Sequence, residues 1–400
     1  MSLAFGRHYL AIPGPSVIPD RVLGAMHRAA PNIYQGELVE MMPGLLRDLR
    51  RVARTEGANV AIYISNGHGA WEAVNANLLS RGDKILVAVT GHFGRTWALS
   101  AENMGIEVET IDFGKEPIDP ARVEEALAND RAHRIKAVFA THTDTATTIR
   151  NDIKAVRQAI DAARHPAALV VDAIASLGCD ELYFDDWGID VLIGASQKGL
   201  MTPPGLGFVW FSQKALAASE GSDLVTPYWD WRLRSLSTEF YRYFGGTAPT
   251  HHLYGLREAL TLLLEEEGLE AAWRRHAVLA SSVWAAVETW SQEGDIALNV
   301  PARSSRSHSV TGMRIGSGGA ARLREWSEKN AGVTLGIGLG MAAPNEPSYG
   351  DFLRVAHMGY VNAHMTLGVL SVMEAGMRAL GISHGTGALD AAAQVIAEAV

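Results

Sequence analysis

The feature that most constrains the fold is an alternation of short apolar runs with longer amphipathic segments through the first two thirds of this 400-residue chain. The apolar runs have the length of buried strands, and the segments between them carry apolar residues at helical spacing. This order predicts an α/β fold with an open, mostly parallel seven-stranded sheet covered by helices. The predicted strands cover 60–64, 84–89, 107–111, 137–140, 168–172, 191–194 and 207–211, and the helices cover 38–53, 70–79, 96–104, 121–128 and 151–163.

The pattern changes after residue 254, where longer helices and fewer strands are expected. A chain of this length exceeds what one core usually holds, so two domains are predicted. We expect a large domain over 20–255 and a smaller α/β domain made of 1–19 and 256–400, because the first segment is predicted to cross back. The second unit is predicted to contain helices 256–268, 269–292, 320–330 and 362–379 and strands 309–315 and 352–356.

Composition excludes several classes of protein. The net charge of −9 argues against nucleic acid as the main partner, because phosphate binding needs clustered Lys and Arg. Cys179 is the single cysteine, so no intrachain disulfide is possible. The first residues lack the apolar core of a signal peptide, and no apolar run reaches the roughly 18 residues of a membrane span. These features predict a cytoplasmic protein that is not bound to a membrane.

Two charged residues at the ends of predicted strands indicate the chemistry. Lys198 lies in a turn of small and polar residues after one strand, and Asp172 ends the strand before it. Ligands of parallel sheets bind at the carboxyl ends of the strands. A lysine that forms a Schiff base and an acid that holds a pyridine nitrogen protonated are what pyridoxal phosphate requires. The pair therefore predicts a pyridoxal-phosphate site.

A glycine-rich turn after the first predicted strand is a candidate phosphate site. Gly67 and His68 lie where that strand gives way to a helix, and free N–H groups at a helix start attract anions. The alternative is a purely structural turn, which the sequence alone leaves open. The turn matches neither a Walker loop nor a GxGxxG fingerprint, which argues against ATP and NAD.

Three further residues are candidates for contact with a cofactor or substrate. Phe93, after the second strand, is placed to stack on a flat ring or to pack in the core. Thr145, in the polar run 141–145 after the fourth strand, offers a hydroxyl to a ring or phosphate, or caps a turn. Arg354 lies on an apolar strand, where its guanidinium needs an anion; a substrate carboxylate and a structural salt bridge are the two alternatives.

No metal site is predicted. The adjacent pair His251 and His252 would face different directions on a helix or strand, and no acid or cysteine stands nearby at ligand spacing. Cys179 lies in an apolar stretch and is expected to be an inert packing residue.

Together these segments resemble the class V aminotransferases of fold type I, in particular the alanine–glyoxylate and serine–glyoxylate aminotransferase group. The resemblance runs from residue 12 to about residue 359 and depends most on the motifs 171–178, 196–198 and 203–205. It implies a pyridoxal-phosphate enzyme with Lys198 as the Schiff-base lysine. The remaining roles that it implies are ring-nitrogen binding by Asp172, ring stacking by Phe93, ring contact by Thr145, phosphate binding by Gly67, His68 and Gln197, and clamping of the amino-acid carboxylate by Arg354.

The resemblance also implies a homodimer in which each subunit completes the other's site. Thr247 matches a threonine lent to the neighbour's phosphate, whereas Phe244 stands where the family often has a tyrosine. Two further departures affect the substrate. The run 146–148 is Ala-Thr-Thr where Ser-Thr-Gly is usual, and the substrate-proximal segment 32–35, which contains Tyr34 as a candidate substrate contact, differs from the usual Gly-His or His-Arg.

The predicted activity is a ping-pong transfer of an amino group from a small amino acid, such as serine or alanine, to a 2-oxo acid, with glyoxylate as the first choice. The alternatives within the group are pyridoxamine–pyruvate, ureidoglycine–glyoxylate and aminophosphonate–pyruvate transamination. A class V cysteine desulfurase is disfavoured, because that chemistry needs a mobile reactive cysteine. A cofactor-binding transcription sensor is disfavoured, because no basic DNA-binding module remains outside the enzyme-like region.

Overall fold

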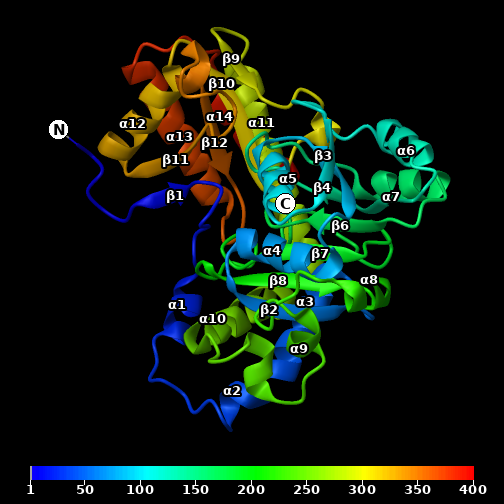
Figure 1. Cartoon of the computed structure of the whole chain (residues 1–400). Coiled ribbons are helices and arrows are strands. Elements are labelled where there is room, and N and C mark those ends of the chain that lie inside the picture. The colour runs from blue at the N-terminus through cyan, green and yellow to red at the C-terminus, as the bar shows by residue number, and fades with distance from the viewer. Residues whose placement is uncertain (1) are drawn as a thin grey trace.

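The computed structural model describes residues 2–400 and contains two sheets (Figure 1). The larger sheet has seven strands in the order β2-β8-β7-β6-β5-β3-β4. Only β8 runs antiparallel to its neighbours, so the predicted mostly parallel α/β sheet is confirmed. The strands are β2 (Asn59–Ser65), β3 (Lys84–Val89), β4 (Glu107–Asp112), β5 (Ile135–Thr141), β6 (Ala168–Asp172), β7 (Val191–Ala195) and β8 (Gly205–Phe211).

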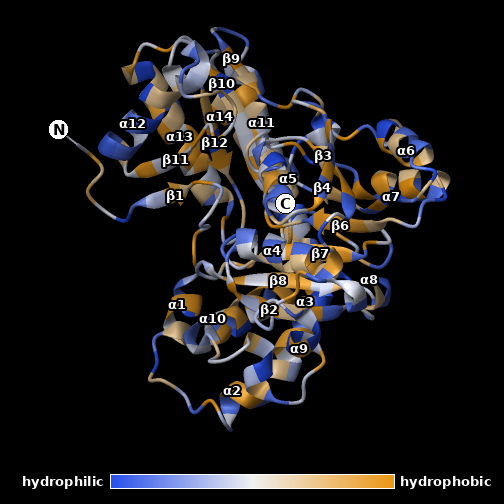
Figure 2. Ribbon diagram, viewed as in Figure 1, coloured by the Kyte–Doolittle hydropathy of each residue, from blue (hydrophilic) through white to orange (hydrophobic). Residues whose placement is uncertain are grey.

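Helices cover both faces of this sheet, and alternate strand residues supply the two cores. In β2, Val60 and Ile62 belong to one buried cluster, while Ala61 and Tyr63 belong to the other. This period of two is expected of a strand that is buried on both faces, and it explains the continuous apolar colour of the central strands in Figure 2. The first cluster packs against α3 (Met42–Ala53), α6 (Pro120–Asn129), α7 (Ile153–Ala162) and α10 (Thr250–Thr261), and the second against α4 (Gly67–Leu78) and α5 (His92–Asn103).

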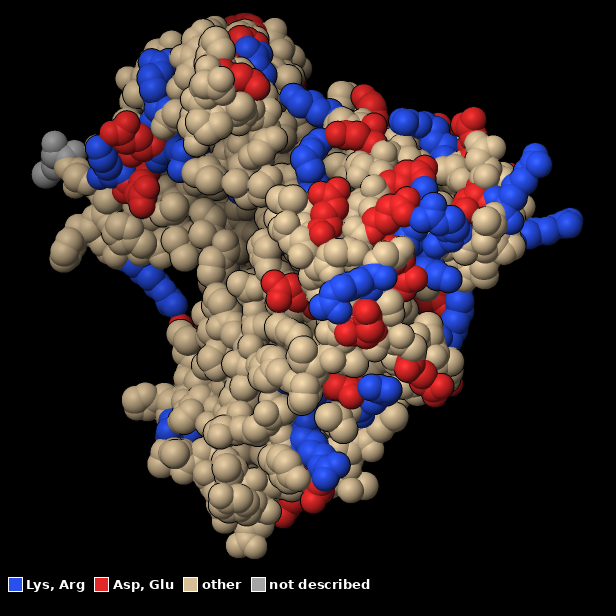
Figure 3. Space-filling view, in the orientation of Figure 1, with Lys and Arg blue, Asp and Glu red and all other residues tan. Residues whose placement is uncertain are grey.

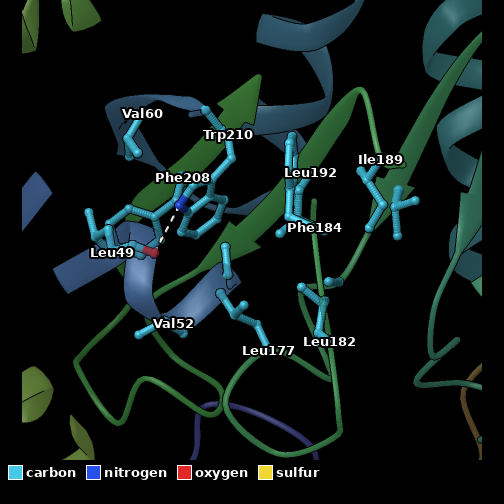
Figure 4. Packing of buried hydrophobic residues seen from close by; sticks show 14 of the residues in the cluster. Leu49, Val52, Val60, Leu177, Leu182, Phe184, Ile189, Leu192, Phe208 and Trp210 are labelled. Carbon is cyan, nitrogen blue, oxygen red and sulfur yellow. Dashed lines mark hydrogen bonds between the residues drawn. The ribbon is translucent and has the colours of Figure 1, made fainter. Parts of the chain in front are cut away.

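Figure 4 shows part of the first cluster, where Trp210 of β8 packs beside Phe208 and donates its indole N–H to the Leu49 carbonyl at 3.0 Å. That bond satisfies the one polar atom of a fully buried ring. It also fixes α3 against the sheet.

The smaller sheet has five strands in the order β1-β11-β12-β10-β9. β1 (Tyr9–Ala11) pairs in parallel with β11 (Val333–Ile337), so the first residues of the chain lie beside its last third (Figure 1). The predicted domain boundaries remain a prediction. The other elements of this part are β9 (Ile296–Leu298), β10 (Val310–Ile315), β12 (Phe352–Ala356), α11 (Leu269–Trp290), α12 (Gly319–Ala331), α13 (Ala363–Ala379) and α14 (Ala388–Glu398).

Several elements were absent from the sequence-based prediction, namely β1, β9 and β11 together with α14 and the short helices α1, α8 and α9, and the predicted helix 38–53 is divided into α2 and α3. α10 also begins six residues before the predicted start of its helix, and it continues as a π-helical segment over Leu262–Glu267. No helix within residues 2–400 has both the length and the apolar character needed to cross a bilayer. The short helices are α1 (Asp20–Met26), α2 (Glu37–Glu40), α8 (Gln213–Ala218) and α9 (Trp231–Ser235).

The register of the large sheet brings the functional strand ends together. Thr141 of β5 lies opposite Asp172 of β6, which in turn lies opposite Ile193 of β7. The turn that carries Lys198 begins at Ser196, three residues after Ile193. The carboxyl ends of the three parallel strands therefore meet at one edge, the usual ligand edge of such sheets.

Candidate active site

The turn after β7 holds Lys198 in a buried position. Ser196 donates its hydroxyl to the Pro203 carbonyl at 2.7 Å and accepts the Leu206 amide at 3.3 Å, which closes the turn between β7 and β8. Gly199 is required next to the lysine, because a Cβ there would lie 2.1 Å from the Leu177 carbonyl oxygen. Burial and the positive charge of Arg354 lower the pKa of Lys198 to about 8.

A segment from the start of the chain covers this lysine. The Lys198 ammonium donates to the Pro13 carbonyl, and Ser16 bonds the turn twice, from its amide to the Gln197 carbonyl and from its hydroxyl to the Lys198 carbonyl. Gly14 has φ +107°, and a Cβ on it would lie 2.7 Å from Lys198 Cε. The sequence prediction used residues 12–15 only as a family motif and did not place them in the site.

Asp172 is buried and held by two donors. The indole N–H of Trp71 in α4 reaches its Oδ2 at 3.0 Å, and the Ile174 amide reaches its Oδ1 at 2.8 Å. Burial nevertheless dominates and raises the pKa of Asp172 to about 7. A cationic ring nitrogen beside this carboxyl group would favour its ionised form. Trp71 and Ile174 were both missed by the sequence analysis.

The predicted phosphate turn forms the start of α4. Asn66 caps the helix by accepting the amides of His68 at 3.1 Å and Gly69 at 3.3 Å. Gly67 cannot carry a side chain, because a Cβ would lie 2.3 Å from Ile174 Cδ1. The ring of His68 lies 4.5 Å from that of Trp71 at a tilt of 57°, and partial burial lowers the pKa of His68. The positive end of α4 therefore points into the region between Asp172 and Lys198.

Phe93 lies in the first turn of α5, and a buried acid fixes that turn. Asp144 accepts the amides of Phe93 at 2.9 Å and Gly94 at 3.2 Å through one oxygen and that of Ala146 through the other. The same loop carries Thr145. Asp144 was quoted only within the polar run 141–145, so its capping role was also missed.

Arg354 of β12 is buried and has no carboxylate partner within residues 2–400. Its Nε donates to the Ile337 carbonyl and its Nη1 to the Thr145 carbonyl, both at 2.6 Å. Burial lowers its pKa to about 10. Of the two alternatives raised by the sequence, a structural salt bridge is therefore absent from the described chain.

These side chains enclose a cavity of about 350 Å³. The buried Thr143 hydroxyl and the Gln197 side-chain oxygen have no hydrogen-bond partner in residues 2–400. Unsatisfied buried polar atoms are costly unless a ligand completes them. A lysine, a carboxyl group, an anion-binding helix start and an aromatic side wall fit pyridoxal phosphate. The lining includes Gly14, Gly67, His68, Trp71, Phe93, Thr143, Thr145, Asp172, Ile174, Gln197 and Lys198.

Three predicted site residues are not part of the lining of this cavity, namely Thr247, Tyr34 and Arg354, the last of which reaches the lining through its bond to the Thr145 carbonyl. Thr247 is exposed in the loop before α10, and Tyr34 is 87% exposed between α1 and α2. Phe244, which stands in place of the family's tyrosine, is buried and packs against Phe240 at 5.4 Å between ring centres. A tyrosine hydroxyl at that side-chain position would need a partner in the core.

Cys179 is fully buried, and burial raises the pKa of its thiol to about 12. A thiol in this state is neither mobile nor nucleophilic. Within residues 2–400, no cluster of three or more His, Cys, Asp or Glu side chains is arranged to hold a metal ion.

Comparison with known proteins identifies the class. The model of the family "Aminotransferase class-V" matches residues 9–356. The chain is 37% identical to the serine–glyoxylate aminotransferase of Methylorubrum extorquens, over 92% of this chain and 90% of that protein. It is 35% identical to the L-aspartate–glyoxylate aminotransferase of Paracoccus denitrificans, over 96% and 94% respectively. The fold is shared with the ureidoglycine–glyoxylate aminotransferase of Bacillus subtilis, with a TM-score of 0.87 at 24% identity over 99% and 100% of the two chains.

The chain is thus an aminotransferase with the α/β fold of fold type I. It belongs to the class V aminotransferase family, whose members of this fold depend on pyridoxal phosphate.

Proposed function

We propose that this aminotransferase moves the amino group of a small amino acid, with serine and alanine as first candidates, to glyoxylate. The proposal depends on one observation. Lys198, Asp172 and Thr145 line the same cavity, and Arg354 donates a hydrogen bond to the Thr145 carbonyl. The names of two relatives, one acting with serine and one with L-aspartate, support glyoxylate as the acceptor.

The cofactor would be held by residues from several elements. Asp172 would bind the ring nitrogen, Phe93 would cover one ring face, and Thr145 would contact the ring. Gly67 and His68 at the start of α4, with Gln197, would bind the phosphate. Bound pyridoxal phosphate supplies the electron sink that makes the α-carbon of an amino acid acidic.

The protein's own groups then bind the substrate and move its proton. Arg354 orients the amino acid through its carboxylate, because its guanidinium has no carboxylate partner in the described chain. Lys198 Nζ takes the α-proton of the donor and returns a proton to the α-carbon of the keto acid in the second half-reaction. With a pKa of about 8, about a tenth of the free lysine is neutral at pH 7, far more than an ordinary lysine offers.

We further propose a homodimer in which Thr247 completes the partner's phosphate site and Tyr34 lies near the partner's substrate. The exposure of both residues supports this arrangement, as do the neighbouring exposed apolar side chains of Leu236 and Tyr241. We assign the protein to the cytoplasm. We also propose that it consists of a large domain over 20–255 and a small domain made of 1–19 and 256–400.

The decisive experiment uses purified protein loaded with pyridoxal phosphate. Its visible absorption should bleach with L-serine or L-alanine and return with glyoxylate. Lys198→Ala should lower turnover by at least about a thousandfold, because both nucleophile and base are removed. Lys154→Ala, at an exposed lysine on α7, is the matched control and should leave turnover unchanged. Wild-type turnover in Lys198→Ala would overturn the proposal.

The substrate assignment is separable from the reaction class. If pyridoxamine, ureidoglycine or an aminophosphonate bleached the cofactor faster than serine and alanine, the amino donor would be reassigned. Preference for pyruvate over glyoxylate in the second half-reaction would likewise reassign the acceptor. Lys198 and Asp172 would keep their roles in each case.

A further inference from the structure

A second cavity lies on the other side of Arg354. It has a volume of about 650 Å³ and is bounded by the first turn of α5, by α12 and by the segment 337–350 that joins β11 to β12. Figure 3 shows the hollow between the part of the molecule that contains α12 and the body that contains α5. Nothing in the proposed function uses this space.

Arg354 is hydrogen-bonded to one lining residue of each cavity. Its guanidinium bonds the carbonyl of Ile337, which lines the second cavity, and that of Thr145, which lines the first. Phe352 also lines the second cavity and shares a face of β12 with Arg354, because side chains alternate along a strand. A substrate carboxylate bound at Arg354 would therefore lie next to the second space.

Glycines let the backbone approach its neighbours closely along one wall of this cavity. A Cβ at Gly338 would lie 2.4 Å from Phe352 Cβ, and one at Gly336 would lie 2.8 Å from Pro13 Cδ. Gly340, at φ +68°, brings the backbone against the ring of His92, where a Cβ would lie 2.7 Å from His92 Cβ. The segment after β11 therefore packs tightly against β12 and α5, and it bounds the cavity on that side.

One cation in this cavity lacks an acidic partner. Arg324 of α12 is half-buried, and its Nε donates to the Leu335 carbonyl at 3.2 Å. No carboxylate of residues 2–400 lies within ion-pair distance of it, although Glu328 is one helical turn away. Arg95 is already paired with Asp112 at 2.6 Å.

The positive charge of Arg324 acts on Arg354, the residue proposed to bind the substrate carboxylate. It contributes to lowering the pKa of Arg354, after the larger effect of burial. Glu346 is the one acidic residue in the cavity lining, and it is exposed. A half-buried guanidinium with free N–H groups beside another arginine is suited to a second anion.

We propose that Arg324 binds a second acidic group of the substrate and so admits dicarboxylic amino donors and keto acids. This inference rests on the proposed function, since it assigns Arg354 to the first carboxylate. Serine and alanine leave Arg324 without a ligand, whereas a dicarboxylic acid supplies a second acidic group for it.

The first test compares L-aspartate with L-asparagine, which has the same shape without the second charge. The loaded enzyme should prefer aspartate in kcat/KM by about tenfold or more, the usual effect of one charge-assisted hydrogen bond. Arg324→Gln should remove that preference mainly through KM and leave serine turnover within about twofold. Arg322→Gln, at an exposed arginine two residues earlier on α12, is the control and should keep the preference.

The second test needs no turnover. Calorimetric titration of the loaded enzyme with succinate should give at least about tenfold weaker binding in Arg324→Gln, whereas propionate should bind both proteins equally. Equal succinate affinity in the two proteins, or equal rates for aspartate and asparagine in the wild type, would overturn the inference. Failure of the amino-transfer reaction itself would appear as unbleached cofactor with every donor, while the succinate result would still report on Arg324.

Discussion

Replacing Trp71 with phenylalanine tests the electrostatic role of a residue that carries no charge. The indole N–H is one of two donors to the buried Asp172 carboxylate, at 3.0 Å. A hydrogen bond to a charged group contributes about 1.5–3 kcal/mol, which corresponds to roughly one to two pKa units. Since the pKa of Asp172 is already raised to about 7, Trp71→Phe should move it well above neutrality.

The expected result is a pH-dependent loss of activity. At pH 7 the variant should lose about five- to fiftyfold in kcat, because fewer molecules carry the ionised Asp172 that holds the ring nitrogen. The loss should shrink as the pH rises and the carboxyl group ionises. The assay is the pH profile of kcat between pH 6 and 9, read together with the absorption spectrum of the loaded protein.

Trp97 provides the matched control. It stacks on Trp71 at 5.9 Å, and its buried indole N–H has no hydrogen-bond partner in residues 2–400. Trp97→Phe therefore removes the same atoms without removing a hydrogen bond, and it should leave the pH profile in place. If both variants shifted the profile equally, packing rather than the hydrogen bond would explain the effect, and the reasoning would be refuted.

Two other predictions concern the segment over Lys198 and the stability of the cofactor-free protein. Gly14→Ala should lower kcat by more than about tenfold, because the new Cβ meets Lys198 Cε at 2.7 Å; Gly6→Ala, equally strained in φ but open in space, should retain activity. Asp172→Asn should stabilise the cofactor-free protein at pH 8. The folded pKa of Asp172 lies near 7 against 3.8 unfolded, so ionisation costs stability as the pH rises through this window. Urea unfolding should show a gain of about 4 kcal/mol at pH 8 that vanishes near pH 4, and a pH-independent difference would contradict the argument.

The sheet and the charged strand ends were predictable because both depend on local pattern. The strand prediction needed only a period of two and runs of apolar residues, and all seven strands agree within two residues at each end. Asp172 and Lys198 were found because they follow such runs directly. The contacts that tune these groups were missed because they cross long stretches of chain. Trp71 is 101 residues from Asp172 and Pro13 is 185 residues from Lys198.

Some of the elements that the sequence-based prediction missed do have a recognisable pattern in the sequence. α14 carries apolar residues at 388, 389, 392, 393 and 396, a helical spacing that was overlooked. α5 begins at His92 rather than at residue 96, and Gly91, the residue before it, has no side chain with which to cap the helix. The cap is Asp144, contributed by a different strand end, and no local rule reveals it. This earlier start is what places Phe93 in the first turn, where it lines the cavity.

The structure also separates reaction chemistry from substrate choice. Lys198 and Asp172 lie at the ends of neighbouring strands of the large sheet, and their contacts come from α4 and the first residues of the chain. Arg354 and Arg324 belong to the smaller sheet and its helix α12, across the cavity from α5. A shift of the smaller sheet would therefore move both arginines together and leave Asp172 with its contacts to α4. It would also reach Lys198, because β1 of that sheet leads directly into Pro13, which accepts the hydrogen bond of the lysine. Substitutions in α12 are the ones that can alter which acid is accepted at least cost to proton transfer, because α12 contacts neither Lys198 nor Asp172.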